Sequence, residues 1–230
     1  MSGFLKILEN EVQIAALSFM AVVYILRLAW IFHFRTRRDR TFAVGRASAG
    51  AGYSLLNIAM PRAMESTRKR PGFYAQFVVF HVGVAAAIAG TLIIPYAPGL
   101  FDRRPVVLLF QGLIAAAFVV GIARLVRRLN NPVLRSVSSP DDYFSLVLLI
   151  VWFAAAVLAV PNRPEKGEGP LIAYFALTAF FLVYVPFSKI CHYLYYPFTR
   201  YYLGRSLGHR GAFPPAQAGG VRKARGKERA

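Results

Sequence analysis

The sequence predicts an all-α integral membrane protein, built as a bundle of five transmembrane helices. Composition is the first reason, because 57% of the 230 residues are hydrophobic and 17% are charged. Soluble domains run at about 45–50% apolar and about 25% charged residues. The second reason is that the apolar residues gather in blocks of roughly 20, the length with which a helix crosses a bilayer. The third is the net charge of +18, since the basic residues cluster at the ends of these blocks.

Each apolar block is expected to form one membrane span. The first block follows Glu9 and Glu11 and is long enough to span, so it does not resemble a cleavable signal peptide. The fourth block is short but uncharged, and the fifth is long enough to tilt or kink. The spans are placed at about 12–34, 73–96, 105–126, 143–160 and 170–197. Together they predict one membrane domain at 1–208.

The basic residues predict the direction of the spans, because Lys and Arg mark the cytoplasmic side. The poorer side holds Lys6, Arg103, Arg104, Arg163 and Lys166. The richer side holds the tail and Arg35, Arg37, Arg38, Arg40, Arg46, Arg62, Arg68, Lys69, Arg70, Arg124, Arg127, Arg128 and Arg135. The N-terminus is therefore predicted outside and the C-terminus in the cytoplasm. The tail at 209–230, with its Gly, Pro, Arg and Lys, is predicted to be a disordered basic cytoplasmic segment.

The long loop between the first two spans contains an apolar stretch at 53–64. Two interpretations of this stretch stay open. It is either a short helix that lies on the membrane surface or against a cytoplasmic partner, or it is an ordinary connecting loop.

The sequence lacks the residues that several classes of function need. Cys191 is the single cysteine, so any iron–sulfur cluster would belong to a partner, because such a cluster normally takes four cysteines. No Walker loop, Gly-x-Ser-x-Gly or His-Glu-x-x-His motif is present. The spans carry no deep Asp or Glu, which argues against a proton-coupled transporter. Since the basic clusters are explained by the membrane, no nucleic-acid partner is expected.

Two of the four histidines lie inside predicted spans, where ionisable side chains are costly and usually functional. His81 is eight residues past Phe73, and His192 is five residues before Pro197. At about 1.5 Å per residue, they lie roughly 12 Å and roughly 8 Å from the cytoplasmic ends of their spans. The spans run in opposite directions, so both imidazoles reach a similar depth, which suits bis-His ligation of a b-type haem. The alternative is that each is a buried polar residue bonded to a neighbouring helix.

The surroundings of these histidines are compatible with both interpretations. Small residues follow His81 as far as Gly90, and they allow either a flat macrocycle or another helix to approach. Lys189 and Arg200 are candidates to pair with haem propionates. His33, at the cytoplasmic end of the first span, is expected to be an interface residue, with haem ligation as the alternative.

Three further polar side chains have simpler expected roles. Arg27 lies close enough to the end of the first span to extend its guanidinium to the interface. Gln111, in the third span, is placed to form a hydrogen bond across helices. His209 lies in the polar tail, and no role in the membrane is expected for it.

Three stretches stand out along the spans: Phe-His-Val-Gly-Val at 80–84, Arg-Arg-Leu-Asn-Asn-Pro-Val-Leu-Arg at 127–135 and Pro-Phe-Ser-Lys-Ile-Cys-His at 186–192. In this order and topology they resemble the gamma subunit of respiratory nitrate reductase. They also resemble the cytochrome b subunits of heterodisulfide-reductase-like and sulfite-reduction-associated membrane complexes. Met-Glu-Ser-Thr-Arg at 64–68 is more similar to these relatives. The resemblance covers about residues 10–205.

The resemblance implies that His81 and His192 ligate the iron of a haem b. It implies a multi-pass subunit of the inner, cytoplasmic membrane of a bacterium or archaeon, which passes electrons between the quinone pool and a cytoplasmic partner. That partner would be an iron–sulfur protein or a molybdoenzyme subunit, docked with the help of the basic loops. Alone, the chain is expected to be a non-catalytic electron-transfer subunit of an oxidoreductase complex, because no groups are arranged for acid–base or nucleophilic chemistry.

The sequence departs from the family pattern at the second haem of the nitrate reductase subunit. The ligands of that haem would fall ten residues after His81 and eighteen before His192, where this chain has Thr91 and Tyr174. One haem is therefore expected, the one nearer the cytoplasm, and the family's quinol-site residues are not carried over. The alternative function is a haem-free membrane anchor or assembly scaffold with the same helical frame. A small transporter is a third possibility, for which the sequence offers no site.

Overall fold

A computed structural model describes residues 1–34, 39–60 and 63–215. This part of the chain is helical, has no strand, and folds as two compact units. The first, called the membrane unit here, comprises Met1–Ile31 and Gly72–Cys191; the second, the hairpin unit, comprises Phe32–Pro71 and the chain from His192 onward. The sequence predicted a single domain at 1–208. In the structure, the loop after the first span packs against the helix that begins at His192, and these segments form the hairpin unit.

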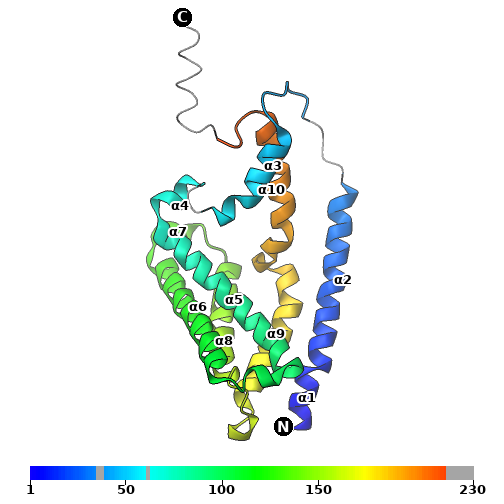
Figure 1. The fold of residues 1–230 in the computed structure, drawn as a ribbon, viewed down its shortest axis with the longest axis vertical. Helices are drawn as coiled ribbons and strands as arrows, with labels where there is room; N and C mark the ends of the chain where they lie inside the picture. Colours follow the sequence, from blue (N-terminus) through cyan, green and yellow to red (C-terminus); the bar gives the residue numbers. More distant parts are fainter. Residues whose placement is uncertain (35–38, 61–62, 216–230) are drawn as a thin grey trace, which may run out of the picture. The chain divides into compact units, whose positions relative to one another are not determined.

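Five helical segments of the described chain are long and apolar enough to cross a membrane. This confirms the prediction of an all-helical, multi-pass membrane protein. The spans are α1 (Gly3–Glu9) with α2 (Glu11–His33), α5 (Pro71–Tyr96), α6 (Arg104–Asn130), α8 (Pro140–Ala159) and α9 (Gly169–Tyr184) with the turn that follows it to Phe187. The α-helices are labelled in Figure 1. The short connecting helices are η2 (Pro98–Leu100), α7 (Pro132–Ser136) and η3 (Pro164–Lys166).

The fourth span begins at Pro140, slightly earlier than the predicted residue 143. Its start is set by a capping box, in which the Ser139 backbone N–H donates to the Asp142 carboxylate at 2.7 Å. Pro140 occupies the first turn, where its missing N–H leaves no hydrogen bond unmade. The helix therefore starts where its first backbone donors can be satisfied, and the polar residues of the first turn belong to it.

The fifth span ends earlier than predicted. A single helix was expected at 170–197, but α9 stops at Tyr184. Pro186 explains the difference, because its ring lacks an N–H and crowds the preceding turn of an α-helix. The chain then passes through two 3₁₀ turns, η4 (Val185–Phe187) and η5 (Lys189–Cys191), before α10 begins at His192. His192 is thus the first residue of a new helix rather than part of the fifth span.

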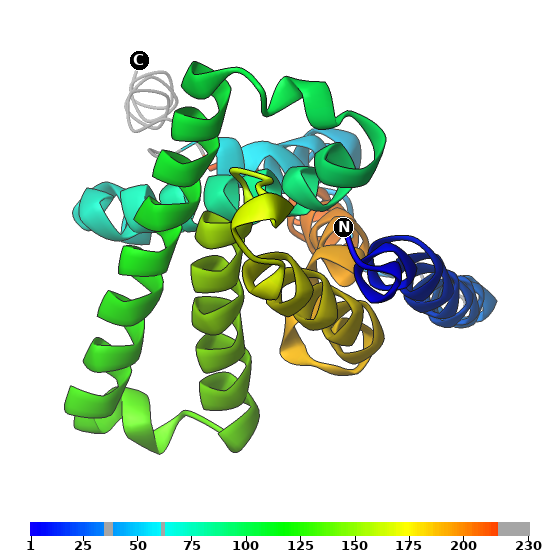
Figure 2. The ribbon, with the colours of Figure 1, turned by 90° about the horizontal axis from the view of Figure 1, so that it is seen from below.

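The core of the membrane unit combines aromatic, aliphatic and small side chains. Within it α8 contacts both α6 and α9, an arrangement that Figure 2 shows from below. Phe153, Tyr174 and Phe175 are fully buried in this core. The indole Nε1 of Trp152 donates to Thr178 Oγ1 at 2.9 Å, so the buried polar atoms between α8 and α9 satisfy each other.

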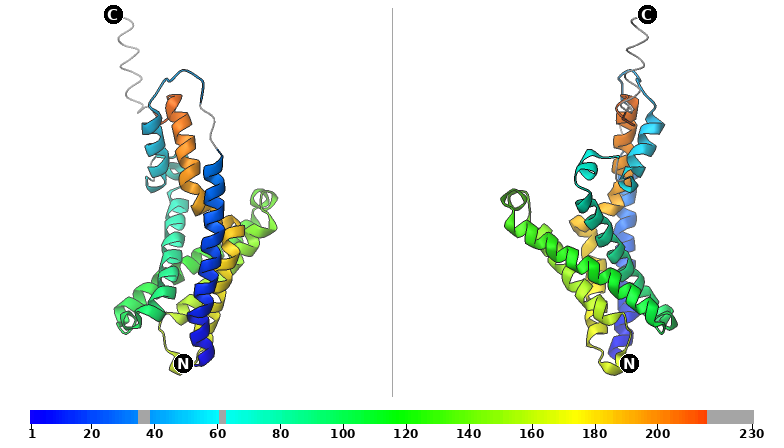
Figure 3. Two further views of the ribbon diagram at one scale, coloured as in Figure 1. Left: turned by 90° about the vertical axis from the view of Figure 1, so that its right-hand side faces the viewer. Right: turned by 60° about the vertical axis from the view of Figure 1, so that its left-hand side comes forward.

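The hairpin unit is a close pair of helices, α3 and α10, which lie side by side in Figures 1 and 3. Glycines let the two backbones touch. A Cβ placed on Gly50 would lie 2.3 Å from the Gly204 carbonyl oxygen and 2.4 Å from the Gly208 Cα. The helices of this unit are α3 (Ala47–Leu56), η1 (Asn57–Ala59), α4 (Glu65–Lys69) and α10 (His192–His209).

The apolar stretch predicted at 53–64 forms the last turn of α3 together with η1, and residues 61–62 lie outside the described residues. Its partner is α10 of its own chain. Arg200 Nε donates to the Ser54 carbonyl at 3.2 Å, and an Arg200 terminal nitrogen donates to Asn57 Oδ1 at 2.6 Å. Ser54 and Asn57 are both buried, so this guanidinium satisfies polar groups that the helix pair removes from water.

The C-terminal end of α10 is tied to the loop before α3. His209 Nε2 donates to the Thr41 carbonyl at 2.8 Å, and Arg210 Nε donates to Asp39 at 2.9 Å. Hydrogen bonds from Thr41, with further help from Arg210, lower the pKa of Asp39 to about 2. The tail predicted to be disordered at 209–230 is therefore ordered in its first residues, and 216–230 lie outside the described residues.

Candidate functional site

His81 lies on α5, and its imidazole has a defined tautomer. Its Nδ1 is 2.7 Å from the carbonyl oxygen of Phe77, one turn earlier on the same helix. The Phe77 ring packs against the imidazole, with 4.2 Å between the ring centroids. A carbonyl oxygen only accepts hydrogen bonds, so Nδ1 is the donor, and in the neutral imidazole this leaves the lone pair on Nε2. Metal-ligating histidines typically have this arrangement, in which a backbone carbonyl orients the ring through its other nitrogen.

The small residues that follow His81 belong to helix packing. A Cβ on Gly83 would lie 2.2 Å from the Ala117 Cβ on α6, and a Cβ on Gly90 would lie 2.9 Å from the Tyr174 hydroxyl on α9. Of the two interpretations of this face, close approach of other helices is therefore the one that the structure supports.

His81 itself lies on the exposed side of α5. The neighbouring exposed side chains are Val78, Ile88 and Leu92, at spacings of three, seven and eleven residues from the imidazole. These spacings place them along one stripe of the helix. The imidazole is thus the polar group in an otherwise apolar stripe, the kind of surface against which a flat apolar cofactor or another membrane helix packs.

The two positions that correspond to a second haem use their hydroxyl groups within the bundle. Thr91 Oγ1 donates to the Ile88 carbonyl at 2.7 Å. Tyr174 is fully buried, and its hydroxyl donates to the Ala87 carbonyl on α5. The Tyr174 side chain fills the space beside Gly90. At both positions the hydroxyl is thus bonded to a backbone carbonyl of α5.

His192 and His33 belong to the hairpin unit, whereas His81 belongs to the membrane unit. His192 is exposed, and its ring packs edge-on against Tyr193 with 6.4 Å between centroids. His33 is the last residue of α2, also exposed, and its ring contacts Phe34 with 5.3 Å between centroids. The contacts of each histidine are therefore described within its own unit.

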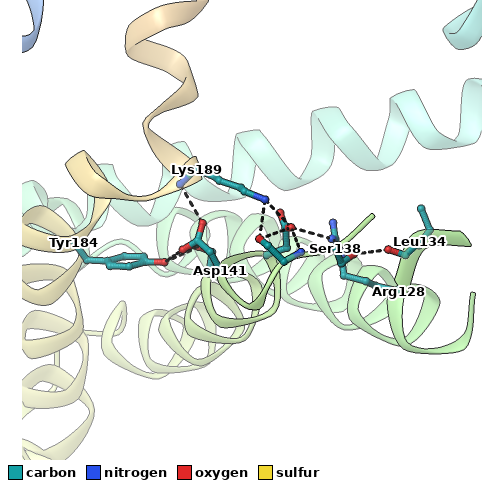
Figure 4. A network of polar contacts seen from close by, with 9 residues as sticks. Arg128, Leu134, Ser138, Asp141, Tyr184 and Lys189 are labelled. Atoms are coloured by element: carbon teal, nitrogen blue, oxygen red, sulfur yellow. Dashed lines mark hydrogen bonds and ion pairs between the residues drawn. The ribbon is translucent and has the colours of Figure 1, made fainter. Parts of the chain in front are cut away.

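A network of polar contacts lies where α8 begins, close to η5 (Figure 4). Lys189 Nζ donates to Asp142 Oδ2 at 2.7 Å and to Ser139 Oγ at 2.8 Å. The Tyr184 hydroxyl donates to Asp141 Oδ1 at 2.5 Å, and the backbone N–H of Lys189 donates to Asp141 Oδ2 at 3.3 Å. Two adjacent carboxylates of α8 thus hold the end of α9 and the turn that follows it.

The network joins two of the three family-like stretches. Arg128 donates to Ser138 Oγ at 2.6 Å, and its terminal nitrogen lies 3.8 Å from Asp142 Oδ2. Because Lys189 bonds the same carboxylate, the second and third stretches meet at Asp142. His81 and the first stretch lie elsewhere, on α5. The network therefore anchors the turn that leads to the start of α10.

The ion pair between Lys189 and Asp142 is expected to stabilise this junction modestly. The Lys189 side chain is 58% exposed, so water screens the pair, and a double-mutant cycle with Lys189→Met and Asp142→Asn should give a coupling of about 0.5–1 kcal/mol. The coupling is measured by unfolding the purified chain in SDS mixed micelles. Lys166→Met, at an exposed lysine of η3, is the control and should show no coupling to Asp142→Asn. A coupling above about 3 kcal/mol would contradict the screened pair and indicate a desolvated one.

The basic residues near the histidines are arranged differently from the prediction. Lys189 and Arg200, the two candidates for haem propionates, each bond protein groups. Arg124 is a further candidate that sequence reasoning counted as a charge beside a loop. It lies within α6, half-buried, with its Cζ 5.9 Å from the centre of the Phe80 ring, and its Nε has no hydrogen-bond partner among the described residues. The sequence feature that could have identified Arg124 was its position one turn before Arg127, inside the apolar block.

Gln111 has a partner of the expected kind, and Arg27 lies against an aromatic ring. Gln111 Nε2 donates to the Val157 carbonyl at 2.9 Å, which confirms a hydrogen bond between α6 and α8. The Arg27 guanidinium lies over the Phe187 ring, 5.7 Å from its centre. No group of three or more His, Cys, Asp or Glu that could hold a metal ion occurs in the part of the chain that the structure describes. Comparison with protein-family models and with curated proteins gives no match.

Proposed function

We propose that the chain is the membrane-anchoring cytochrome b subunit of a respiratory redox complex. It transfers electrons between the quinone pool and a cytoplasmic iron–sulfur or molybdoenzyme partner, and it holds a single b-type haem through His81 and His192. The observation that carries this proposal is the His81 imidazole in a membrane span, with its Nδ1 bonded to the Phe77 carbonyl. An ionisable side chain at such a position is a functional candidate by default.

The donor set fits a b-type haem, because two imidazoles from different helices suffice and no acidic or thiol ligand is needed. When bound, the haem supplies one-electron redox chemistry, and the protein supplies ligands, orientation and a low dielectric. The Phe77 carbonyl keeps Nε2 of His81 as the ligating nitrogen. Arg124 supplies a half-buried positive charge beside Phe80, suited to a propionate. The Lys189 network holds the turn that precedes His192.

A single haem is supported by the packing at the positions of the absent second site. Tyr174 is buried against Gly90 and bonds the Ala87 carbonyl, so its side chain fills the space beside α5. Thr91 bonds its own helix. The hydroxyl groups at both positions serve the helix contacts.

The proposed orientation has the N-terminus outside and the C-terminus in the cytoplasm of a bacterial or archaeal inner membrane. Seventeen of the 28 Lys and Arg residues belong to the hairpin unit, but only three of the ten Asp and Glu residues do. Positive charge favours the cytoplasmic side, and it would also attract an acidic face of the redox partner.

The ligand assignment is tested with histidine variants of the purified chain from haem-replete cells. His81→Ala and His192→Ala are each expected to lose the b-type absorption, because the remaining imidazole holds only one side of the iron. His209→Ala, at a histidine that bonds the Thr41 carbonyl, is the matched control and should keep it. His33→Ala should also keep it. Full b-type absorption in His81→Ala or His192→Ala would show that the mutated histidine is not a haem ligand. Loss of the absorption in His33→Ala would show that His33 is needed for haem binding.

A haem-free anchor or assembly scaffold is the second candidate function. It is favoured by the Gly83 and Gly90 contacts, since these pack α5 directly against α6 and α9. A wild-type chain that folds and assembles without a Soret band, despite haem-replete expression, would establish this function instead.

A further inference from the structure

Two adjoining hollows lie between α3 and α10 of the hairpin unit, and both are lined by Leu55 and Tyr201. The larger, of about 560 Å³, is also lined by Ser48, Gly52 and Arg205. The Arg205 guanidinium stands over the Tyr201 ring, with 5.6 Å from its Cζ to the ring centre. It also donates to the Tyr201 hydroxyl at 3.4 Å. One end of the combined groove thus carries an exposed, positively charged group.

The other end of the groove is apolar and aromatic. The smaller hollow, of about 310 Å³, is lined by Phe32, Pro197, Phe198 and Tyr202 besides the shared residues. Phe32 and Phe198 pack edge to face, with 5.4 Å between their centroids. The groove is therefore amphipathic along its length, with rings at one end and a guanidinium at the other.

One residue that lines the groove comes from the end of a membrane span. Phe32 belongs to the last turn of α2, and the span Gly3–His33 ends one residue later. Tyrosine rings are typical of the level at which lipid headgroups begin. Tyr201 and Tyr202 are both partly exposed on the wall of this groove. Tyr201 and Tyr202 therefore suit contact with a lipid headgroup.

The positive charge of the hairpin unit favours an anionic headgroup on a lipid bound in the groove. The hairpin unit has seventeen basic and three acidic residues, and the two described acids, Asp39 and Glu65, form ion pairs with Arg210 and Lys69. A basic surface at the cytoplasmic end of a span attracts anionic lipid headgroups.

We propose that this α3–α10 groove binds one anionic phospholipid. The phosphate lies at Arg205, and an acyl chain lies along Phe32, Phe198 and Tyr202. Neither His81 nor His192 lines the groove, and lipid binding there does not depend on a haem. The haem experiments above and the experiment below therefore fail independently.

The test counts lipids retained by the full chain, using native mass spectrometry of the detergent-solubilised protein. The probes are dioleoylphosphatidylglycerol, dioleoylphosphatidylcholine and inorganic phosphate. One phosphatidylglycerol per chain is expected, with about a fivefold preference over phosphatidylcholine, since one basic group near the headgroup contributes about that factor. Inorganic phosphate, which lacks the acyl chains, should not displace it.

Two variants in the larger hollow separate occupancy of the groove from preference for the headgroup. Gly52→Trp should remove the bound lipid, because a Cβ at Gly52 has no atom within 4 Å and the indole extends into the hollow. Gly72→Trp, at an equally open glycine outside the groove, is its control. Arg205→Gln should remove only the preference for phosphatidylglycerol, and Arg68→Gln, an equal loss of charge in the same unit, should leave it intact.

Three results would overturn the proposal. If Gly52→Trp retains as much lipid as Gly72→Trp does, the groove is not the binding site. Equal losses in Arg205→Gln and Arg68→Gln would show diffuse attraction of lipid to the basic surface. Displacement of the lipid by inorganic phosphate would show a free-phosphate site.

Discussion

Replacing Gly50 by Ala is expected to separate α3 from α10 and to destabilise the hairpin unit by about 3 kcal/mol, the upper end of the usual cost of overpacking. The added methyl group would meet the Gly204 carbonyl oxygen at 2.3 Å and the Gly208 Cα at 2.4 Å. Both are backbone atoms of a helix, so neither can rotate away as a side chain would. Relief therefore requires one helix to move.

Gly52→Ala is the matched control for this prediction. Gly52 lies on the same helix two residues later, and a Cβ there has no atom within 4 Å. Ala is favoured over Gly in a helix interior by about 0.5–1 kcal/mol, so this variant should be as stable as the wild type or slightly more so. Thermal unfolding by circular dichroism, with limited proteolysis of the α3 segment, measures both variants. Equal stability of Gly50→Ala and Gly52→Ala would show that the two backbones do not touch.

Tyr174→Ala is expected to destabilise the membrane unit by about 3–5 kcal/mol, the range for loss of a large buried aromatic side chain. Tyr174 is fully buried and packs against Trp152, Phe175 and Gly90. In a bilayer the destabilisation comes mainly from the contacts that are lost around the cavity. A Tyr174 side chain outside the core would face lipid rather than water. Unfolding in SDS mixed micelles measures the effect.

Tyr174→Phe separates the hydroxyl group from the ring. It removes only the hydrogen bond to the Ala87 carbonyl, and such bonds within membranes contribute about 0.6 kcal/mol on average. If Tyr174→Phe is as damaging as Tyr174→Ala, the hydroxyl rather than the packing of the ring holds α9 against α5. If Tyr174→Ala is harmless, the ring is not a core residue at all.

The spans were predictable because their signal is local. Runs of about 20 apolar residues bounded by charges give helices in the right order, and the start of α8 was also visible in Ser139, Pro140 and Asp142. The end of α9 was missed because hydrophobicity continues through Pro186, whereas the helix does not. Here the backbone chemistry of one proline outweighs the composition of the segment.

The pairing of α3 with α10 was not predicted, because a contact between residues about 150 apart leaves no periodic signal. One hint was present, since Gly204 and Gly208 have the four-residue spacing that lets helices approach closely. Their partner Gly50 stands in a loop that composition alone does not mark as a helix. The partner of these glycines appears only when both segments are seen together.

The site was predictable in part. Sequence alone placed His81 inside a span, but the Phe77 bond that fixes its tautomer depends on the side-chain rotamer. The depth predicted for His192 assumed an unbroken fifth span, and the break at Pro186 makes it the start of α10 instead. Arg124 was overlooked because its charge was counted toward orientation, while its position within α6 places it over Phe80.

The assignment of a single b-type haem to this subunit is best tested on the wild-type chain. The measurement is the reduced-minus-oxidised spectrum of purified protein from haem-replete cells, together with its haem-to-protein ratio. We expect a b-type spectrum and one haem per chain. A protein without haem would contradict the cytochrome assignment and leave the anchor, and two haems per chain would contradict the reading of Thr91 and Tyr174 as packed, non-ligating residues.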